Sequence, residues 1–458
     1  MINYNGHDDV IERVYYYKQE HVFQYWDKLL DFEKLELLND LSSIDFSLLG
    51  KLYPRTENQS AIDFSPAPYI ALPKSDEDSK KFITAENMGS EYIREKKVAA
   101  FLVAGGQGSR LGFDGPKGKF PIGPVSGKSL FHFHAEKIRA SEIKYKTSIP
   151  FLVMTSRDNH TETENFFKNN DYFSLAPDNV HLFPQNMIPS LDLQGKLILS
   201  EPNRIFMNPD GHGGSLTALR TSGALKKMEE LGIETLSYFQ VDNPLVKIID
   251  PVFIGFHIMN QADISSKTLK KSYPEEKTGI FVHFSDEKLG IIEYSDMPDE
   301  KIYAKNNQSE LLYSAANPAI HLFSIPFISK ITGTDDITLP YHTARKKIKA
   351  VINSSHQDIE GYKFEKFVFD ALPLARKNVI LEVLREDEFA PVKNASGQDS
   401  AESAQKIMND INRKWLESRK IVIPPEVRDL EISPLFALSP DDIPVDIVIP
   451  EKEKVLLI

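Results

Sequence analysis

The chain has 458 residues, of which 41% are apolar and 26% charged, and its formal net charge is −12. This length suffices for two or three domains with a large core, and the acidic balance argues against a nucleic-acid or anionic-membrane surface. The absence of cysteine from the sequence excludes disulfides, thiolate catalysis and cysteine-ligated metal sites.

Residues 1–95 are predicted to be largely helical. Apolar residues recur near helical spacing between Val22 and Leu41, whereas prolines from Pro54 to Pro73 predict an irregular connector before the next strand. The first residues are charged and lack the apolar segment of a secretory signal, and no apolar run in the sequence reaches the ~18 residues of a membrane span. We therefore expect a cytoplasmic protein that does not bind membranes.

A strand and a glycine-rich loop form the most informative segment, which reads VAAFLVAGGQGSRLGFDGPKGKFPIGPVSG at 98–127. The run Val98–Val103 is apolar and rich in strand-forming residues, so we predict a buried strand. The glycines after it let backbone N–H groups approach an anionic ligand, and Arg110 and Lys117 add full positive charges. The segment favours nucleotide binding over a plain glycine-rich turn with a solvated basic edge.

Two commoner phosphate-binding loops do not fit this segment. The dinucleotide fingerprint G-x-G-x-x-G fails because Leu111 occupies its third glycine position, which argues against a dinucleotide-dependent oxidoreductase. The Walker A loop fails at Gly123–Ser129, where the spacing between the glycines is one residue too short and includes Pro124. The pattern that fits runs from Leu102 to Lys117 as L-x-A-G-G-x-G-x-R-L-x-x-x-x-P-K.

Between residues 96 and 390, apolar strands alternate with amphipathic segments such as the predicted helix Leu216–Leu231. The predicted strands are Val98–Val103, Ile149–Met154, Thr235–Val241, Gly279–His283, Ile291–Tyr294 and Val379–Val383. This alternation predicts an α/β fold with a mostly parallel sheet covered by helices. Ligand loops of such sheets lie at the carboxyl ends of the strands, where we expect Gly105 and Asp242.

Asp242 is the candidate metal ligand. It follows an apolar strand, and a carboxylate at a strand end opposite a phosphate loop is suited to hold Mg²⁺ together with substrate phosphate oxygens. An aspartate that caps a turn is the alternative for this residue considered alone. The histidines do not cluster at metal-ligand spacing, and no Ser-His-Asp set or H-E-x-x-H motif is present in the sequence.

A second loop and a glutamine are further candidates for nucleotide contacts. The loop Asn208–Ser215 is rich in glycine and precedes a predicted helix, an arrangement that favours anions. Within it we expect Asp210 to form an ordinary turn and His212 to be exposed. Gln185 can accept from and donate to uracil, whereas a plain surface glutamine is the alternative.

Charged residues in later segments are also candidates. Glu293 interrupts the apolar run Ile291–Tyr294 and either accepts from a sugar hydroxyl or faces water. Lys346, Lys347 and Lys393 either balance a polyphosphate or belong to solvated surfaces.

Residues 391–458 are richer in proline, and we expect a small appended domain there. Short apolar runs predict strands at Ile421–Ile423, Val445–Ile449 and Val455–Ile458.

Together these segments resemble the eukaryotic-type UDP-N-acetylglucosamine pyrophosphorylases and the related UTP:sugar-1-phosphate uridylyltransferases. The resemblance extends from Gln19 to Pro434 and rests on LVAGGQGSRLG, PKGKFPIG, FPQNMIPS, NPDGHGG, QVDNPLVK, IIEYSD, EKFVFD and EVLREDEFAPVKNA, in the family's order. It implies a Rossmann-like, GT-A-type nucleotidyltransferase domain at 96–390, between a helical N-terminal region at 1–95 and a small C-terminal domain at 391–458.

The resemblance also implies a reaction in which UTP and an α-sugar 1-phosphate give a UDP-sugar and pyrophosphate, with Mg²⁺ as the cofactor. The expected partners are UTP and a sugar 1-phosphate, without nucleic acid, and the chain is expected to be a monomer or a weak oligomer. A nonenzymatic nucleotide-sugar sensor on the same fold is the alternative. Arg110, Lys117 and Asp242 together argue against it, because a sensor needs no grip on pyrophosphate.

Roles for single residues follow from the resemblance by position. The nucleotide-binding positions are Ala104, Gly105, Gly106, Gln185, Gly211 and His212. The catalytic positions, which face phosphate groups, are Arg110, Lys117, Lys393 and Lys347, with Lys346 as the alternative to Lys347. The metal position is Asp242, and the sugar-binding positions are Gly279, Glu293, Ser314 and Asn317.

Two departures from the family pattern bear on the sugar. His212 stands where the N-acetylglucosamine type usually has asparagine, and Ser-Ala-Ala-Asn at 314–317 replaces the usual Asn-Ala-Gly-Asn. Within this segment, Ser314 and Ala316 lie where the 2-substituent of the sugar should be recognised. Glucose and galactose derivatives therefore stay open beside N-acetylglucosamine.

Overall fold

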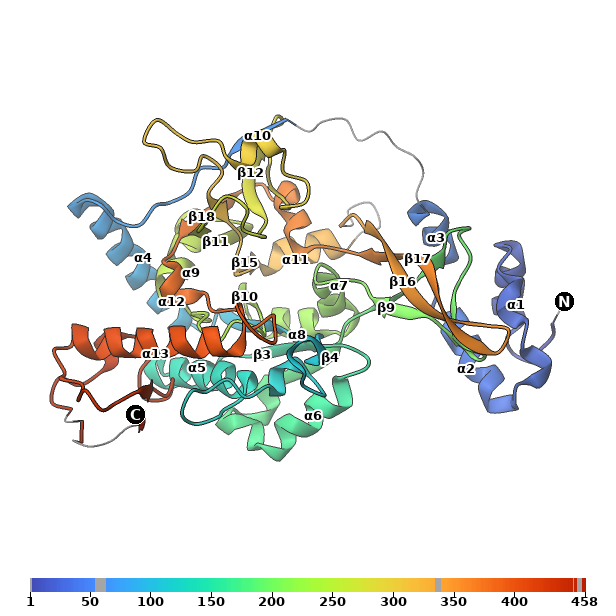
Figure 1. Cartoon of the computed structure of the whole chain (residues 1–458), viewed down its shortest axis with the longest axis horizontal. Helices are drawn as coiled ribbons and strands as arrows, with labels where there is room; N and C mark the ends of the chain where they lie inside the picture. The colour runs from blue at the N-terminus through green and yellow to red at the C-terminus, as the bar shows by residue number, and fades with distance from the viewer. Residues whose placement is uncertain (1, 54–62, 334–338, 448, 451–454) are drawn as a thin grey trace. The chain divides into compact units, whose positions relative to one another are not determined.

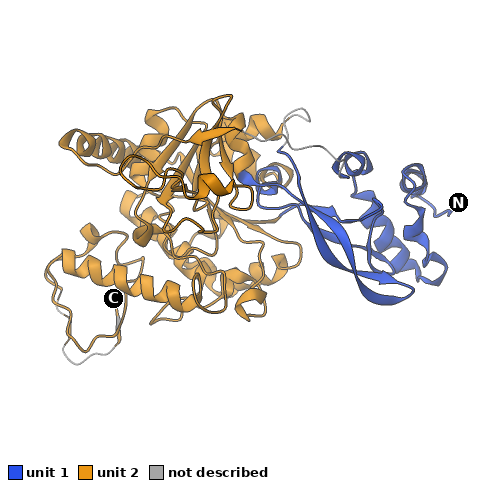
Figure 2. Ribbon diagram, turned by 45° about the horizontal axis from the view of Figure 1, so that its top comes forward, with its two compact units in different colours: residues 1–61, 185–217, 339–368 blue, residues 62–184, 218–338, 369–458 orange. Residues whose placement is uncertain are grey.

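The computed structural model describes residues 2–53, 63–333, 339–447, 449–450 and 455–458 (Figure 1). The chain forms two compact units (Figure 2). Unit 1 contains Met1–Ala61, Gln185–Thr217 and Leu339–Val368, and unit 2 contains Ile62–Pro184, Ala218–Thr338 and Phe369–Ile458. The boundaries expected near residues 95 and 390 divide consecutive stretches of sequence, and they stay a prediction.

Unit 2 is built around a mixed sheet (Figure 1). Four adjacent strands at one end of the sheet are parallel, in the order β10 (Thr235–Gln240), β2 (Val98–Val103), β3 (Phe151–Thr155) and β4 (Val180–Pro184). On the other side of β10 lies the antiparallel strand β15 (His321–Ser324). The sheet then continues through β11, β14, β12 and β1. The fold is therefore mixed α/β with a central sheet that contains parallel strands.

The prediction of a mostly parallel sheet is wrong for most strands beyond β10, although β18 (Asn378–Glu382) pairs in parallel with β11. Strands β12 (Ile280–Phe284) and β13 (Leu289–Ile292) pair antiparallel, as do β11 (Ile264–Lys270) and β15. The connection between β12 and β13 is the turn 285–288, and a parallel pair would need a crossover of a dozen or more residues. The remaining strands of unit 2 are β1 (Phe64–Pro66), β14 (Ala315–Ala316), β19 (Asp429–Glu431) and β20 (Val455–Leu457).

The helices of unit 2 pack against this sheet and against one another. They are α4 (Asp76–Arg94), α5 (Leu130–Tyr145), α6 (His160–Asn169), α8 (Ala224–Glu230), α9 (Pro251–Met259), α10 (Asp299–Ile302), α11 (Ile325–Thr332), α12 (Arg385–Glu388) and α13 (Ala401–Ser418). Ser129 caps α5 by accepting a hydrogen bond from the His132 N–H. The next residues, Leu130 and Phe131, are fully buried in the main core with Leu102 of β2. A strand buried on both faces reads as a continuous apolar run, as β2 does.

Unit 1 combines short helices with a long hairpin. Its helices are α1 (Asp8–Tyr16), α2 (Asp31–Ser42) and α3 (Phe46–Leu52), and α7 (Gly214–Thr221) begins in it and ends in unit 2. Its strands are β5 (Met187–Pro189), β6 (Leu191–Asp192), β7 (Leu199–Glu201), β8 (Arg204–Ile205), β9 (Met207–Pro209), β16 (His342–Ile352) and β17 (Ser355–Glu365). The β16–β17 turn places Asn353 and Ser354 at φ +50° and +62°, the left-handed conformation that two-residue hairpin turns favour.

Two predicted elements in the first half of the chain need correction. The expected connector before β2 contains helix α4 after its last proline, and Ser75 caps this helix through the Asp78 N–H; residues 54–62 of the connector lie outside the described residues. The predicted helix Leu216–Leu231 is divided into α7 and α8, because Gly223 adopts φ +80° between them.

The C-terminal prediction missed helix α13 and placed too many strands. Ile421–Ile423 is irregular, and so are the described residues of Val445–Ile449. The third run does form a strand, β20, which pairs in parallel with β19. Within the parts of the chain that the structure describes, no helix has the length and apolar character needed to cross a membrane.

Candidate active site

The glycine-rich loop after β2 is fixed at its base. Ala104 is buried, and its N–H donates to the carbonyl oxygen of Met154 in β3 (2.8 Å). The side-chain amide of Asn159 donates to the carbonyl oxygens of Ala104 (3.2 Å) and Gly106 (3.4 Å). Asn159 is completely buried and no motif pointed to it, so sequence reasoning missed a residue that holds the loop in shape.

The tip of the same loop is accessible. Gly105 is half-buried and Gly106 is exposed, so their backbone can approach a ligand. Arg110 is also exposed, on the short turn Ser109–Leu111. The loop closes on itself where the Lys117 N–H donates to the carbonyl oxygen of Gly106 (3.0 Å). This closure brings Lys117 back to the end of β2.

Lys117 and Asp242 meet at the carboxyl ends of β2 and β10. These strands are parallel with Val103 opposite Gln240, so the segments that follow them emerge at one edge of the sheet. Lys117 Nζ lies 3.1 Å from Asp242 Oδ2, and the two side chains are only 17% and 14% exposed. An ion pair with so little exposure is less screened than a surface pair. The structure thus brings together the candidate phosphate-loop lysine and the candidate metal ligand.

A neutral histidine supports the chain directly before Asp242. His134 of α5 is completely buried, and its Nε2 lies 3.0 Å from the carbonyl oxygen of Val241. Burial lowers the pKa of His134 to about 3, so the ring is neutral and its Nε2–H donates this hydrogen bond. The histidine fixes the strand end without adding a charge next to the carboxylate.

The segment before Lys393 is attached to the same strand end. The Val392 N–H donates to the carbonyl oxygen of Asp242 (2.9 Å). The side chain of the next residue, Asn243, donates to the carbonyl oxygen of Glu388 (2.7 Å). Lys393 follows Val392 and is exposed. The structure therefore brings a third predicted residue to the edge where Lys117 and Asp242 meet.

Asp399 is a further charged residue at this edge that sequence reasoning missed. Its carbonyl oxygen accepts from the N–H groups of Lys393 (2.6 Å) and Asn394 (2.9 Å). Burial raises the pKa of its carboxyl group; the Lys393 ammonium opposes this rise, and the Asp242 carboxylate adds to it. The sequence Gly397-Gln-Asp399 was the available signal, because glycine and aspartate tolerate the left-handed φ values of +77° and +55° found there.

The residues at this edge fit a divalent cation that is bound jointly by a protein carboxylate and by phosphate oxygens of a substrate. Within the described ranges, no three His, Asp or Glu side chains converge in a way that could hold a metal ion by themselves. Mg²⁺ is commonly bound through one or two carboxylates together with substrate phosphates. The part-buried carboxylate of Asp242 at the open end of β10 provides such a ligand.

Three of the four predicted sugar residues lie together beside β12. The Asn317 N–H donates to the carbonyl oxygen of Gly279 (2.9 Å). A Cβ atom on Gly279 would lie 2.8 Å from Oε1 of Glu293, so glycine is needed for this carboxylate to approach the backbone. Glu293 was expected to interrupt a strand at Ile291–Tyr294. In the structure it follows Ile292, the last residue of β13.

Ser314 is the fourth predicted sugar residue. It lines a cavity of about 410 Å³ with Tyr69 and Lys271, and this cavity is not lined by Gly279, Glu293 or Asn317. The carbonyl oxygen of Ser314 accepts from the Lys271 N–H (2.8 Å). Burial lowers the pKa of the Lys271 ammonium and raises that of the Tyr69 hydroxyl. Ser314 thus lines this cavity at a position three residues before Asn317.

In unit 1, the second glycine-rich loop packs closely against residues 365–368. Gly211 has φ +84°, and a Cβ atom on it would lie 2.5 Å from the carbonyl oxygen of Lys366. The Gly213 N–H donates to the same oxygen (2.8 Å). The close approach of the two backbones requires glycine at both positions.

His212 is half-buried, so its predicted exposure is wrong. Its Nδ1 accepts from the Val368 N–H (3.1 Å), and its ring stacks on Phe367 with 5.4 Å between the ring centres. The contacts with Val368 and Phe367 therefore keep the imidazole partly buried. Gln185, the first residue of the segment Gln185–Thr217 of the same unit, is 9% exposed, which excludes the alternative of a surface glutamine.

Asp210 does more than form a turn. It is 3% exposed, and burial raises the pKa of its carboxyl group to about 7 against the opposing charge of Lys366. Burial also lowers the pKa of the Lys366 ammonium, whose Nζ lies 4.4 Å from the ring centre of Tyr341. Lys346 and Lys347 are exposed on β16 of this unit, opposite Gly361 and Glu360 of β17.

Comparison with known proteins connects this geometry to one family. The model of the UTP–glucose-1-phosphate uridylyltransferase family matches residues 52–436. UDP-N-acetylglucosamine diphosphorylase 2 of Arabidopsis thaliana is 35% identical over 95% of this chain and 91% of its own length. The human UDP-N-acetylhexosamine pyrophosphorylase-like protein 1 is 34% identical over 89% of this chain and 85% of its own length.

A solved structure is similar over the full chain. The uridine diphosphate N-acetylglucosamine pyrophosphorylase of Trypanosoma brucei, in complex with an inhibitor, superposes with a TM-score of 0.85 at 27% identity. The match covers 100% of this chain and 99% of that one.

Proposed function

Because the chain belongs to the UTP–glucose-1-phosphate uridylyltransferase family, we propose that it transfers the uridylyl group of UTP to a sugar 1-phosphate and releases pyrophosphate. The observation that supports this proposal most strongly is the Lys117–Asp242 pair, which joins the glycine-rich loop to the end of the adjacent parallel strand. This combination offers a cation for phosphate and a carboxylate for a metal ion at one place. A sensor on the same fold would need neither.

In the proposed reaction, an oxygen of the sugar phosphate attacks the α-phosphorus of UTP in line with the leaving group. The bond from that phosphorus to the bridging oxygen breaks, and pyrophosphate leaves with this oxygen. Such a transfer needs positioned reactants and balanced charge but no covalent protein nucleophile. We assign the charge balance on the phosphates to Arg110, Lys117 and Lys393, with Lys347 as a further phosphate contact by family position.

Asp242 would hold Mg²⁺, which when bound supplies positive charge to the phosphate oxygens of UTP. The remaining roles follow the family positions: Ala104, Gly105, Gly106, Gln185, Gly211 and His212 toward the nucleotide, and Gly279, Glu293, Ser314 and Asn317 toward the sugar. The accessible tip at Gly106 supports the first set. The contact of Gly279 with both Glu293 and Asn317 supports the second.

The parallel order of β10, β2, β3 and β4 supports a Rossmann-like, GT-A-type description of unit 2. Candidate ligand residues at the carboxyl ends of β2 and β10 agree with it, because open α/β sheets bind ligands there.

We propose N-acetylglucosamine 1-phosphate as the preferred sugar substrate. The names of the relatives support this choice. Ser314, one departure from the family pattern, lines the cavity with Tyr69 and Lys271. His212, the other departure, uses its ring to contact Phe367 and Val368.

The test is pyrophosphate release with UTP and Mg²⁺, comparing N-acetylglucosamine 1-phosphate, glucose 1-phosphate and galactose 1-phosphate. We expect kcat/KM to be highest for the N-acetyl substrate by at least about tenfold, which is ~1.4 kcal/mol of discrimination. A preference for an unsubstituted hexose phosphate would overturn the sugar assignment and leave the transfer intact. Release with none of these substrates would overturn the transfer.

A further inference from the structure

Helix α5 carries three residues that follow one another along one side of the helix at a spacing of three: Phe131, His134 and Lys137. Phe131 and His134 are completely buried. Each of the three contacts a segment that carries one member of the Lys117–Asp242 pair. These three residues are called the α5 face below.

The first residue of the α5 face supports the turn that carries Lys117. A Cβ atom on Gly118 would lie 2.2 Å from Cζ of Phe131, so the backbone of this turn lies directly on the phenyl ring. The Leu130 N–H, one residue before Phe131, donates to the carbonyl oxygen of Phe120 (3.1 Å). The short turn is thereby seated on the first turn of α5.

The other two residues of the α5 face hold the chain on both sides of Asp242. His134 Nε2 donates to the carbonyl oxygen of the residue before Asp242 (3.0 Å). Lys137 Nζ donates to the carbonyl oxygens of Pro244 and Val246, the latter at 2.9 Å. One helix therefore contacts the backbone at both members of the candidate ion pair.

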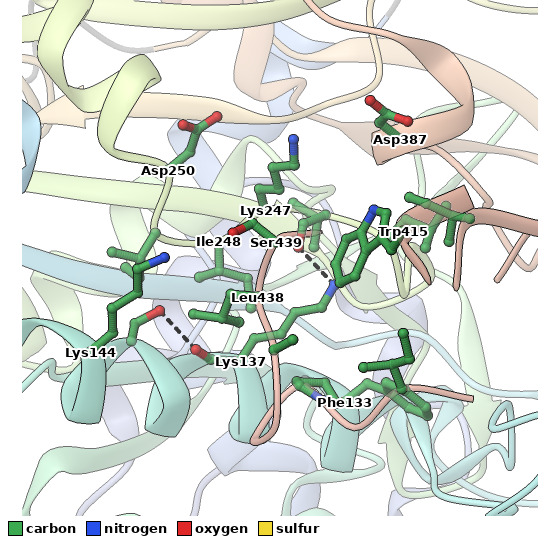
Figure 3. Close-up of a pocket in the computed structure, with 18 of the residues that line it drawn as sticks. Phe133, Lys137, Lys144, Lys247, Ile248, Asp250, Asp387, Trp415, Leu438 and Ser439 are labelled. Carbon is green, nitrogen blue, oxygen red and sulfur yellow. Dashed lines mark hydrogen bonds between the residues drawn. The ribbon is translucent and has the colours of Figure 1, made fainter. Parts of the chain in front are cut away.

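Lys144, two turns further along α5, shows the ordinary behaviour of a lysine on this helix. Its side chain is 41% exposed and pairs with Asp442 (2.8 Å). Figure 3 shows Lys137 and Lys144 leaving α5 in different directions. The course of Lys137 toward backbone oxygens is therefore a property of its position on the α5 face.

The hydrogen bonds of Lys137 do not require its charge. Burial lowers the pKa of Lys137 to about 7. Both the ammonium and the neutral amine carry at least two N–H groups, so either form can donate to two carbonyl oxygens. These contacts are suited to fix a position, whereas an exposed lysine such as Lys393 is suited to supply a charge.

The separation of Lys117 and Asp242 needs such a support. The two residues are 125 positions apart in the sequence. Their direct ion pair cannot fix the separation during the proposed reaction, because Lys117 would then face phosphate and Asp242 a metal ion. The contacts with α5 involve the backbone and neither of these side chains, so they are compatible with bound UTP and its metal ion.

We propose that the α5 face sets the separation of Lys117 and Asp242, with His134 and Lys137 as positioning residues for the metal-bound phosphates of UTP. This positioning role rests on the proposed function, because it concerns the same site. Both residues act through the backbone that carries Asp242, and neither is assigned a contact with substrate.

Calorimetric titration with UTP tests this role without turnover, because no sugar phosphate is present. Each protein is titrated with Mg²⁺ and again with a chelator, and the Kd with chelator divided by the Kd with Mg²⁺ gives the metal gain. His134→Leu and Lys137→Met should each lower the metal gain by about tenfold, since loss of a contact that orients a metal ligand typically costs 10–100-fold in metal affinity. The Kd with chelator should stay within about twofold of wild type. An unchanged metal gain in both variants, or an equal rise of both Kd values, would overturn the proposal.

Conservative variants separate positioning from a general loss of structure. His134→Gln and Lys137→Arg should keep the metal gain within about threefold of wild type, because an amide and a guanidinium can donate to the same carbonyl oxygens. Ile138→Val controls for lost stability, since Ile138 is fully buried in the main core and its side chain donates no hydrogen bond. Lys144→Met controls for loss of a lysine from α5. A lowered metal gain in either control, or no recovery in both conservative variants, would contradict the proposal.

A paired change tests the Phe131 end of the α5 face. Gly118→Ala presses a Cβ atom against Phe131 and displaces the turn that carries Lys117. We expect the Kd of UTP to rise by at least about fivefold even with chelator, because one preorganised charge is misplaced. Phe131→Leu makes room for the added atom, so the double variant should recover at least about threefold. No loss in Gly118→Ala, or no recovery in the double variant, would contradict the role of Phe131.

The wild-type titrations distinguish failure of this role from failure of the proposed function. A wild-type chain with the same Kd for UTP with Mg²⁺ and with chelator would refute the metal role of Asp242, and the positioning role would fall with it. A wild-type chain that shows a metal gain, with variants that keep it, would refute the positioning role alone.

Discussion

The side chains at the carboxyl ends of β2 and β10 differ in charge, and this difference decides what each can do. Lys117 and Asp242 form a part-buried ion pair, whereas His134, close behind Asp242, is held neutral by burial. The first two can meet phosphate and metal charges, and the third supports the backbone. Asp210 is an intermediate case, because burial raises the pKa of its carboxyl group to about 7.

The stability of the protein should therefore depend on pH through Asp210. Its carboxyl group binds a proton more tightly in the folded chain than in the unfolded chain, where the pKa is 3.8. The resulting contribution to folding is complete below that unfolded value and is lost as the pH rises through about 7. We predict that Asp210→Asn raises the free energy of unfolding at pH 8, by up to about 4 kcal/mol, and changes it little near pH 4.

Urea titrations at the two pH values measure this difference. Asp178→Asn is the control, because Asp178 is exposed and belongs to a short surface turn. The same gain for Asp210→Asn at both pH values, or a gain for Asp178→Asn as large, would show that the buried carboxyl is not the cause.

Among the elements, helices α4 and α9 depend on two glycines for their close packing, and Figure 1 shows them side by side. A Cβ atom on Gly89 of α4 would lie 1.9 Å from the carbonyl oxygen of Pro251. One on Gly255 of α9 would lie 1.8 Å from the carbonyl oxygen of Ala85. Both clashes are with backbone, so the helices would have to separate.

Gly89→Ala should accordingly lower the free energy of unfolding by about 1–3 kcal/mol, although alanine is the better helix former. Gly50→Ala in α3 is the matched control, because Gly50 is exposed and a Cβ atom there meets nothing within 4 Å. It should raise the free energy of unfolding by about 0.5–1 kcal/mol. Chemical denaturation compares the two variants, and a stabilised Gly89→Ala would disprove the packing argument.

Elements with a strong local signal could be predicted from the sequence. Strand β2 agrees with its apolar run residue for residue, and β10 differs by one residue at its end. Local pattern failed where distant partners decide the structure. The antiparallel pairing of β11 with β15 depends on residues that are far apart in the sequence, and α13 owes its position to burial of Met408 and Ala404 in the main core.

The candidate site divides in the same way. Gly106, Lys117 and Asp242 could be predicted because each lies in a short local motif directly after a strand. Asn159 could not be found in this way, because it holds a loop from another part of the chain. The signal for Asp399 was local, since its carbonyl oxygen bonds the nearby Lys393 and Asn394, and it was missed.

For the whole molecule, a net charge of −12 has to coexist with an anionic substrate. Exposed charges are screened beyond ~8 Å at physiological ionic strength, so the lysines and arginine around β2 set the local field. Binding of UTP to the folded chain then stabilises it by mass action.

At a free UTP concentration of about 100 times its Kd, with Mg²⁺ present, the free energy of unfolding should rise by about 2.7 kcal/mol. Removal of the metal with a chelator should reduce this gain, and Asp242→Asn should abolish its metal-dependent part while Asp178→Asn retains it. Calorimetric melting measures the effect. A gain that is independent of metal in the wild-type protein would contradict the role of Asp242.

Turnover of two lysine variants decides whether the Lys117–Asp242 edge is the reacting centre. Lys119 lies on the same short turn as Lys117, but its Nζ pairs with Glu162 (2.5 Å). With UTP, Mg²⁺ and N-acetylglucosamine 1-phosphate, we predict that Lys117→Ala lowers kcat for pyrophosphate release by roughly 10²–10³, the loss typical of one preorganised electrostatic group. Lys119→Ala should stay within about threefold of wild type, as a surface ion pair allows. Unchanged turnover in Lys117→Ala, or equal losses in both variants, would contradict this assignment.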